Sequence, residues 1–204
     1  SLGGASGLFW DDSTNNIGIG TTSPSERMTV QNGSILQQGG TASDPYTPEI
    51  VGSLNIGDSP RSVHVSGSYG YVVDAGSNEL KVIDVSESDN PIQVGALGLG
   101  NVLFGDPLYV SGTYAYVVDE GSEDLKIINI SNPSNPTQVG TFGLGTSPES
   151  VHVVGSYAYV VDAGSDDLKV IDISDPSSPN QVGSLGIGPH PYSLHVFGSY
   201  AYVS

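Results

Sequence analysis

Residues 67–86 read GSYGYVVDAGSNELKVIDVS, and this stretch decides the fold. It returns at residues 112–131 as GTYAYVVDEGSEDLKIINIS and at 155–174 as GSYAYVVDAGSDDLKVIDIS. A fourth copy begins at Gly198 with GSYAYVS. Self-similarity at a fixed period of about 43 residues is typical of repeat proteins, in which each unit stacks on its neighbours.

Each copy predicts a β-hairpin, because two runs of β-branched and aromatic residues flank an acidic turn that contains glycine. Strands are also expected before the hairpin, at SVHV, and after it, at QVGSLGI. Four short antiparallel strands in such a period are typical of one blade of a β-propeller. Side chains alternate between the two faces of a strand. We therefore expect the first tyrosine of each YxYVVD run to be buried between stacked blades, namely Tyr69, Tyr114 and Tyr157.

The chain is expected to be all-β, with three regions. Residues 1–38 form a small N-terminal β module, residues 39–48 (GGTASDPYTP) have the composition of a linker, and residues 49–204 hold three full blades and a truncated fourth. Closed propellers need about four to eight blades. We therefore expect the sequence to be a fragment of a longer chain; the alternative is that a neighbouring molecule supplies the missing strand.

Composition excludes several classes of partner. Five basic residues stand against 22 acidic ones, which gives a net charge of −17 and disfavours nucleic acids and anionic membrane surfaces. No stretch approaches the roughly 20 apolar residues of a membrane-spanning helix, so no membrane insertion is expected. The chain has no cysteine, so disulfides and thiolate metal sites are excluded. Because it begins without Met or a signal sequence, we expect a mature or truncated product.

Two resemblances add to this. The strands LKVIDV, LKIINI and LKVIDI, with YAYVVD before two of them and turns such as SDPSSP after them, resemble the LVIVD-repeat family over residues 49–204. That resemblance implies a β-propeller and says little about chemistry. Residues 10–33, WDDSTNNIGIGTTSPSERMTVQNG, resemble a stalk segment of tail-fibre-like and other bacterial or viral surface-fibre proteins. Together they imply an extracellular location, or one on the surface of a cell or virion.

The repeats place histidines and lysines at equivalent positions. His64, His152 and His195 share one place in the strand before the hairpin, where the second copy has Tyr109. A ring of imidazoles could bind a metal, but packing explains the same register and is the interpretation we favour. The three lysines of the hairpins are expected to neutralise acidic neighbours in the turns at well under ~1 kcal/mol each. These pairs are Lys81 with Glu79, Lys126 with Asp124 and Lys169 with Asp167.

The turn of the second copy gathers four carboxylates, at Asp119, Glu120, Glu123 and Asp124. Carboxylate oxygens are the ligands that calcium prefers, so a weak calcium site is one interpretation. Turn capping is the other, because Asp commonly caps hairpin turns and no spacing here matches a known calcium loop. No other cofactor is expected. We also expect no enzymatic activity, since no nucleophile elbow, phosphate-binding loop or zinc spacing is present.

The expected function is that of a non-enzymatic extracellular structural protein, a subunit of a surface fibre or filament. We expect a homo-oligomer held through the N-terminal module, because that module has too few apolar residues for a stable core of its own. Its expected assembly residues are Phe9, Trp10, Ile17 and Ile19. The alternative is a secreted, adhesin-like recognition module that binds a glycan or a protein.

Overall fold

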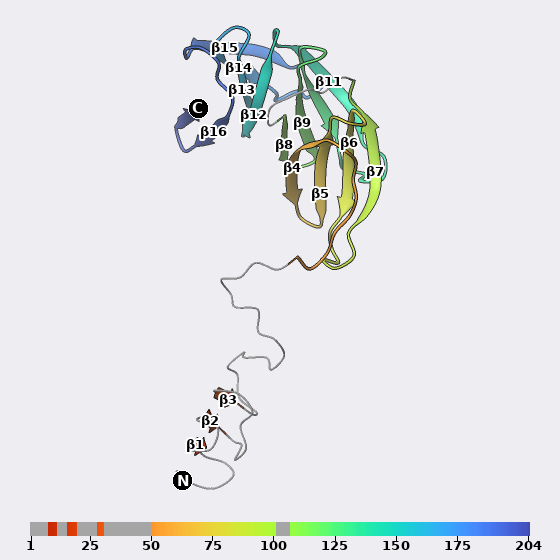
Figure 1. Cartoon of the computed structure of the whole chain (residues 1–204). Helices are drawn as coiled ribbons and strands as arrows, with labels where there is room; N and C mark the ends of the chain where they lie inside the picture. Colours follow the sequence, from red (N-terminus) through yellow and green to blue (C-terminus); the bar gives the residue numbers. More distant parts are fainter. Residues whose placement is uncertain (1–7, 12–15, 20–27, 31–49, 101–106) are drawn as a thin grey trace. The chain divides into compact units, whose positions relative to one another are not determined.

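The computed structural model describes residues 8–11, 16–19, 28–30, 50–100 and 107–204 (Figure 1). The chain divides into two compact units, Ser1–Ile50 and Val51–Ser204. In the first unit β1 (Leu8–Asp11) pairs antiparallel with β2 (Asn16–Ile19), and β2 pairs parallel with β3 (Met28–Val30). The linker expected at residues 39–48 lies outside the described residues.

The second unit consists of three four-stranded antiparallel sheets and a final two-stranded one, and every connection inside a sheet joins neighbouring strands. This confirms the prediction of all-β, propeller-like blades of about 43 residues. Within the described ranges, no helix is long and apolar enough to span a membrane.

The first blade holds β4 (Pro60–Ser66), β5 (Tyr69–Asp74), β6 (Glu79–Asp84) and β7 (Ile92–Gly98). The second holds β8 (Leu108–Ser111), β9 (Tyr114–Asp119), β10 (Asp124–Asn129) and β11 (Thr137–Gly143). The third holds β12 (Pro148–Val154), β13 (Tyr157–Asp162), β14 (Asp167–Asp172) and β15 (Asn180–Gly186), and the fourth holds β16 (Leu194–Phe197) and β17 (Tyr200–Val203).

The blades lie face to face. Their first strands, β4, β8, β12 and β16, follow one another on the inner side of the array, and the last strands β7, β11 and β15 lie at its periphery (Figure 1). Each blade therefore has a forward face, which contacts the next blade along the chain, and a rear face, which contacts the previous one. Both terms are used in this sense below.

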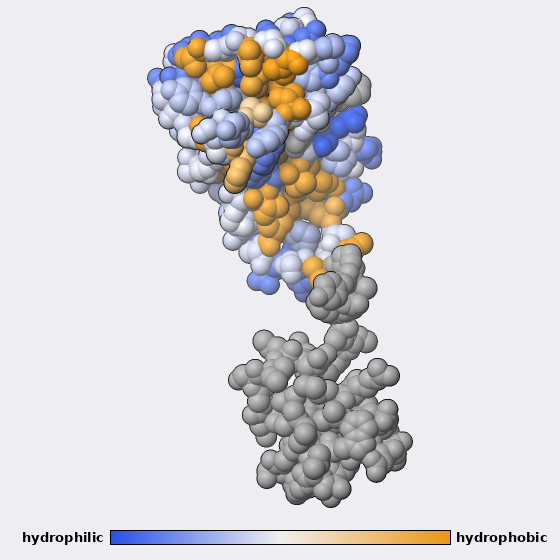
Figure 2. Space-filling model, turned by 90° about the vertical axis from the view of Figure 1, so that its left-hand side faces the viewer, coloured by the Kyte–Doolittle hydropathy of each residue, from blue (hydrophilic) through white to orange (hydrophobic). Residues whose placement is uncertain are grey.

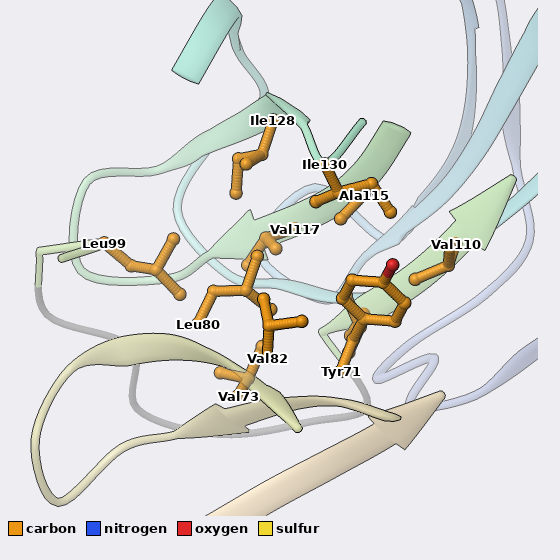
Figure 3. Packing of buried hydrophobic residues seen from close by; sticks show 11 residues of the cluster. Tyr71, Val73, Leu80, Val82, Leu99, Val110, Ala115, Val117, Ile128 and Ile130 are labelled. Carbon is orange, nitrogen blue, oxygen red and sulfur yellow. The ribbon is translucent and has the colours of Figure 1, made fainter. Parts of the chain in front are cut away.

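A buried apolar cluster fills each boundary between full blades. At the first boundary Tyr71 and Val73 on the forward face of β5 meet Val110 and Val117 on the rear face of the second blade (Figure 3). At the second boundary Tyr116 takes the corresponding forward position. Consecutive residues of one strand, such as Tyr116 and Val117, thus belong to different clusters because side chains alternate across a strand.

The expected burial of the first tyrosine of each copy is wrong. Tyr69 and Tyr114 are only partly buried at the edge of the clusters, and Tyr157 is 42% exposed. The second tyrosine occupies the buried position, as Tyr71 and Tyr116 show. The reason is position along the strand, since the first tyrosine begins its strand next to the turn, whereas the second lies two residues further in.

Candidate functional site

A buried lysine–aspartate ion pair spans each hairpin. Nζ of Lys81 lies 2.7 Å from Oδ2 of Asp74, and Nζ of Lys126 lies 2.8 Å from Oδ2 of Asp119. Lys169 and Asp162 form the third pair. All six residues are buried. Two of the neighbouring pairs expected from the sequence are also present, since Glu79 lies 3.8 Å from Lys81 and Asp124 lies 2.7 Å from Lys126. The sequence analysis did not predict the buried aspartate partners.

Two of these pairs also join their blade to the segment before it. Lys81 donates to the carbonyl oxygen of Ile56, which precedes the first blade, and Lys169 donates to that of Leu144, which follows the last strand of the second blade. Asp74 accepts hydrogen bonds from the backbone N–H of Ser59 at 3.2 Å and of Gly76 at 3.0 Å. We call each lysine–aspartate pair a clamp. Each clamp aspartate caps its own turn, and in the first and third blades the clamp lysine also ties the blade to the preceding segment.

The clamp aspartates are held in the ionised form. Burial alone would raise the pKa of Asp74, but hydrogen bonds from Lys81, Gly76 and Ser77 outweigh burial and lower this pKa to about 2. The pKa values of Asp119 and Asp162 are lowered by the same balance, in which burial is opposed by hydrogen bonds from Lys126 and Lys169. The sequence signal for the clamp is the recurrence of Asp at the end of YVVD and of Lys at the second position of LKV or LKI.

The four carboxylates proposed for calcium do not lie together as one group. Asp119 and Asp124 share Lys126, with Ser122 between them, and Glu120 lies near the following blade. Glu123 has a positive φ of 58° at the last position of the turn. Across the part of the chain that the structure describes, no group of three His, Cys, Asp or Glu residues is placed to hold a metal ion. Turn capping is observed at Asp119, whose Oδ1 accepts from the N–H of Gly121 at 3.0 Å, while calcium binding stays a prediction.

Two glutamates meet at the boundary of the second and third blades, which sequence reasoning missed. Oγ of Ser147 lies 3.2 Å from Oε1 of Glu120 and 3.3 Å from Oε1 of Glu149, although a hydroxyl can donate to only one of them at a time. Among the described residues, Oε2 of Glu120 is buried without a hydrogen-bond partner. Burial, followed by repulsion from Glu120, raises the pKa of Glu149.

The inner strands bring the repeat histidines into one arc. His64 contacts Tyr109 at 5.1 Å between ring centroids, Tyr109 contacts His152 at 4.4 Å, and His152 contacts His195 at 4.8 Å. Burial, followed by repulsion from His195 and His64, lowers the pKa of His152. These four rings form a continuous series of aromatic contacts across four blades, which agrees with a packing role for the repeat histidines.

The outermost blade faces are open. Val63 and Val65 on the rear face of β4 are 67% and 62% exposed, whereas Leu108 and Val110 at the same positions of β8 are 4% and 5% exposed. At the other end Tyr202 is 57% exposed, although its equivalents Tyr71 and Tyr116 are buried. Figure 2 shows hydrophobic surface in separate areas on one side of this unit.

The assembly residues expected in the N-terminal unit lie on its first two strands. Phe9 pairs with Gly18, and Trp10 pairs directly with Ile17, while Ile19 pairs with Leu8 and with Val30 of β3. The side chains of these strands lie outside the described part of the chain. Their role in assembly stays a prediction.

Comparisons with solved structures show the same fold. The periplasmic gluconolactonase PpgL of Pseudomonas aeruginosa aligns with a TM-score of 0.59 at 19% identity, over 71% of this chain and 46% of that one. A functionally unknown protein from Desulfotomaculum acetoxidans aligns with a TM-score of 0.55 at 19% identity, over 65% and 44%. The computationally designed Ika4 protein aligns with a TM-score of 0.62 at 12% identity, over 77% and 92%. The chain thus spans less than half the length of these two natural proteins, and such identities show the fold alone.

The sequence comparisons identify the repeats. No curated protein matches the chain. The LVIVD repeat matches it three times, over residues 57–97, 106–143 and 146–186, and these segments correspond to the three full blades. Together they cover more than half of the sequence. The chain therefore belongs to the LVIVD-repeat family.

Proposed function

We propose that this protein is a non-enzymatic structural protein, a subunit of a surface fibre or filament that acts as a homo-oligomer. The observation that carries the proposal is that the repeated charged residues of the hairpins are buried in ion pairs with one another. Lysine and aspartate are frequent catalytic and ligand-binding groups, yet in each hairpin they are buried against each other. In two clamps the lysine also binds a carbonyl of the preceding segment. The repeated polar chemistry of the blades therefore serves to hold neighbouring segments together.

One further feature supports an assembling subunit. In the N-terminal unit, the resemblance of residues 10–33 to fibre stalk segments favours contacts between copies and an extracellular or surface location.

A secreted recognition module that binds a glycan or protein is the second candidate. The observation in its favour is the aromatic arc on the inner strands, because His195 at its end is exposed. In the loop before β16, the rings of His190 and Tyr192 also stack, with centroids 6.5 Å apart. Aromatic rings are frequent contacts in recognition surfaces. The arc itself is in part buried at His152, which favours a packing role for most of its length.

The test is the state of association of the full chain. We expect light scattering to give a mass that rises above that of one 21.0 kDa chain with concentration, and electron microscopy to show fibres or regular oligomers. A chain that stays monomeric up to millimolar concentration, with only discrete small particles, contradicts the structural role. The variant Trp10→Ser then measures how much of the association depends on the N-terminal unit. A mass unchanged by this substitution contradicts the assembly role of Trp10.

A further inference from the structure

We propose that Glu120 and Glu149 share one proton through the hydroxyl of Ser147, and that this proton makes the boundary between the second and third blades sensitive to pH. Glu120 lies on the turn between β9 and β10, and Glu149 lies on β12. The inference concerns an internal boundary of the blade array and does not depend on the proposed fibre role. It rests on the contacts of these three side chains.

The contacts of Ser147 require a proton on one of the two carboxyl groups. Its Oγ lies 3.2 Å from Oε1 of Glu120 and 3.3 Å from Oε1 of Glu149. A serine hydroxyl has one hydrogen to donate, and an ionised carboxylate can only accept. Both contacts are hydrogen bonds only if one carboxyl group is protonated and donates to Oγ, while the hydroxyl donates to the other. Transfer of the proton between the two carboxyl groups reverses the direction of both bonds.

Burial makes two negative charges costly at this place. Glu149 is 7% exposed, and Oε2 of Glu120 is a buried oxygen with no hydrogen-bond partner among the described residues. A buried charge without a partner is unfavourable, and of two carboxyl groups in one site, one keeps its proton to higher pH. Burial, followed by repulsion from Glu120, raises the pKa of Glu149, in agreement with this geometry.

The neighbouring lysines are already bound. Lys126 and Lys169 are held by the clamp aspartates of the second and third blades. Among the ion pairs of the described residues, none includes Glu120 or Glu149. The strands that pack against β12 are β8, β9, β13 and β16. The other titratable groups on these five strands and on the turn are acids and aromatic rings: Asp119, Glu123, Asp124 and Asp162, the rings of Tyr109, His152 and His195, and the tyrosines of β9 and β13.

The repeat itself does not require these glutamates. The equivalent of Glu120 is alanine in the first and third blades. The equivalent of Glu149 is Arg61 in the first blade and Tyr192 in the fourth. The first and third blades form the same four-stranded sheet as the second. Two acids that meet across one boundary are therefore a property of that boundary.

The direction of the pH effect follows from linkage. Below the upper titration step of the pair, the shared proton joins both carboxyl groups to Ser147. Above it both groups are ionised, and one hydroxyl hydrogen remains for two carboxylates. A pKa that is higher in the folded than in the unfolded protein gives stability that is lost as pH rises through the folded value. The boundary is therefore tighter in acid and looser in alkali.

Titration followed by NMR tests the shared proton. The chain has seven glutamates, so labelling their carboxyl groups with carbon-13 gives few signals, and single glutamate-to-glutamine variants assign them. We expect Glu120 and Glu149 to titrate as a coupled pair, in two steps separated by more than about one pH unit. Glu120→Gln or Glu149→Gln should leave a single step, at lower pH than the upper step of the wild type. The control Glu123→Gln, on the same turn, should leave both steps unchanged.

Hydrogen exchange tests the effect on the boundary. The amides of β9 and β12 are compared between the wild type and Glu120→Ala at each pH, because intrinsic exchange also becomes faster as pH rises. Glu120→Ala introduces the residue found in the first and third blades, so this variant is expected to fold. The ratio of wild-type to variant exchange rates should rise by up to about tenfold per pH unit toward the upper step and then level off.

Two coupled steps together with this rise in the ratio support the inference. Titration of both glutamates in one step below about pH 5, where free carboxyl groups ionise, overturns it. An upper step that shifts with calcium concentration also overturns it, since a metal ion then balances the charge in place of the proton. A ratio of exchange rates that is the same at every pH overturns the pH sensitivity of the boundary. The fibre role is tested by the association of the full chain, so it stands or falls separately.

Discussion

The clamp of the third blade gives the most quantitative prediction, the effect of Asp162→Ala. The carboxylate of Asp162 is fully buried and binds Nζ of Lys169, while its Oδ1 accepts from the N–H of Gly164 at 3.0 Å. Removal of the carboxylate leaves a buried ammonium with only the carbonyl of Leu144 as its remaining clamp partner. Breaking a buried ion pair on one side costs about 3–5 kcal/mol, because the remaining charge stays out of water without compensation.

The corresponding change in melting temperature is large. For a unit the size of Val51–Ser204, each kcal/mol shifts the midpoint by about 2–4 °C, so Asp162→Ala should lower it by roughly 6–20 °C. Differential scanning calorimetry and urea unfolding followed by circular dichroism measure the loss. The double variant Asp162→Leu/Lys169→Met should recover most of it, because it removes both charges.

The matched control is Asp167→Ala on the same hairpin. Asp167 lies two residues from Lys169 and is only half-buried, so its removal should cost less than about 1 kcal/mol. Equal losses for Asp162→Ala and Asp167→Ala would refute the clamp as a buried ion pair. A double variant that is no more stable than Asp162→Ala would refute the cost assigned to the unpaired ammonium.

Four other predictions follow from single sites. Glu149→Gln should raise the free energy of unfolding at pH 8 but not at pH 4. The pKa of Glu149 is raised, so its ionised form at pH 8 destabilises the folded protein, and glutamine removes that charge. Urea unfolding at both pH values measures the effect, and equal effects would contradict it. The free energy of unfolding should fall less between pH 7 and pH 5 in His152→Gln than in the wild type. The pKa of His152 is lowered, so its protonation as pH falls destabilises the folded protein. An unchanged pH dependence would contradict this. Glu123→Asn should raise stability by about 0.5–1 kcal/mol, since φ is positive there and Asn78 holds the same position in the first blade; a destabilised variant would show that the Glu side chain matters more than the backbone. Millimolar calcium should raise the melting temperature if the second turn binds it, and a midpoint equal to that in chelator rejects this site.

Local patterns predicted the blades well. The alternation in YAYVVD determines which residues share a face, and glycine-containing turns determine where strands end, so hairpins and blades follow from neighbouring residues alone. The clamp could not be found in this way. Lys169 has Asp167 two residues away on the same face, but Asp162 lies on the adjacent strand directly opposite Asp167. Its selection as the partner depends on burial at the blade boundary. The sharing of Ser147 by Glu120 and Glu149 depends in addition on the relative position of two blades.

The direction of the clamps has a consequence for synthesis of the chain. Lys81 and Lys169 each bond a carbonyl that lies 25 positions earlier in the sequence. A ribosome releases that carbonyl before the lysine, so both partners are outside as soon as the hairpin emerges. In the first and third blades the clamp can then close on a segment that has already been synthesised, and its closure needs no residue from a later blade. Folding of the array can therefore advance with translation, one blade after another, from the N-terminal end.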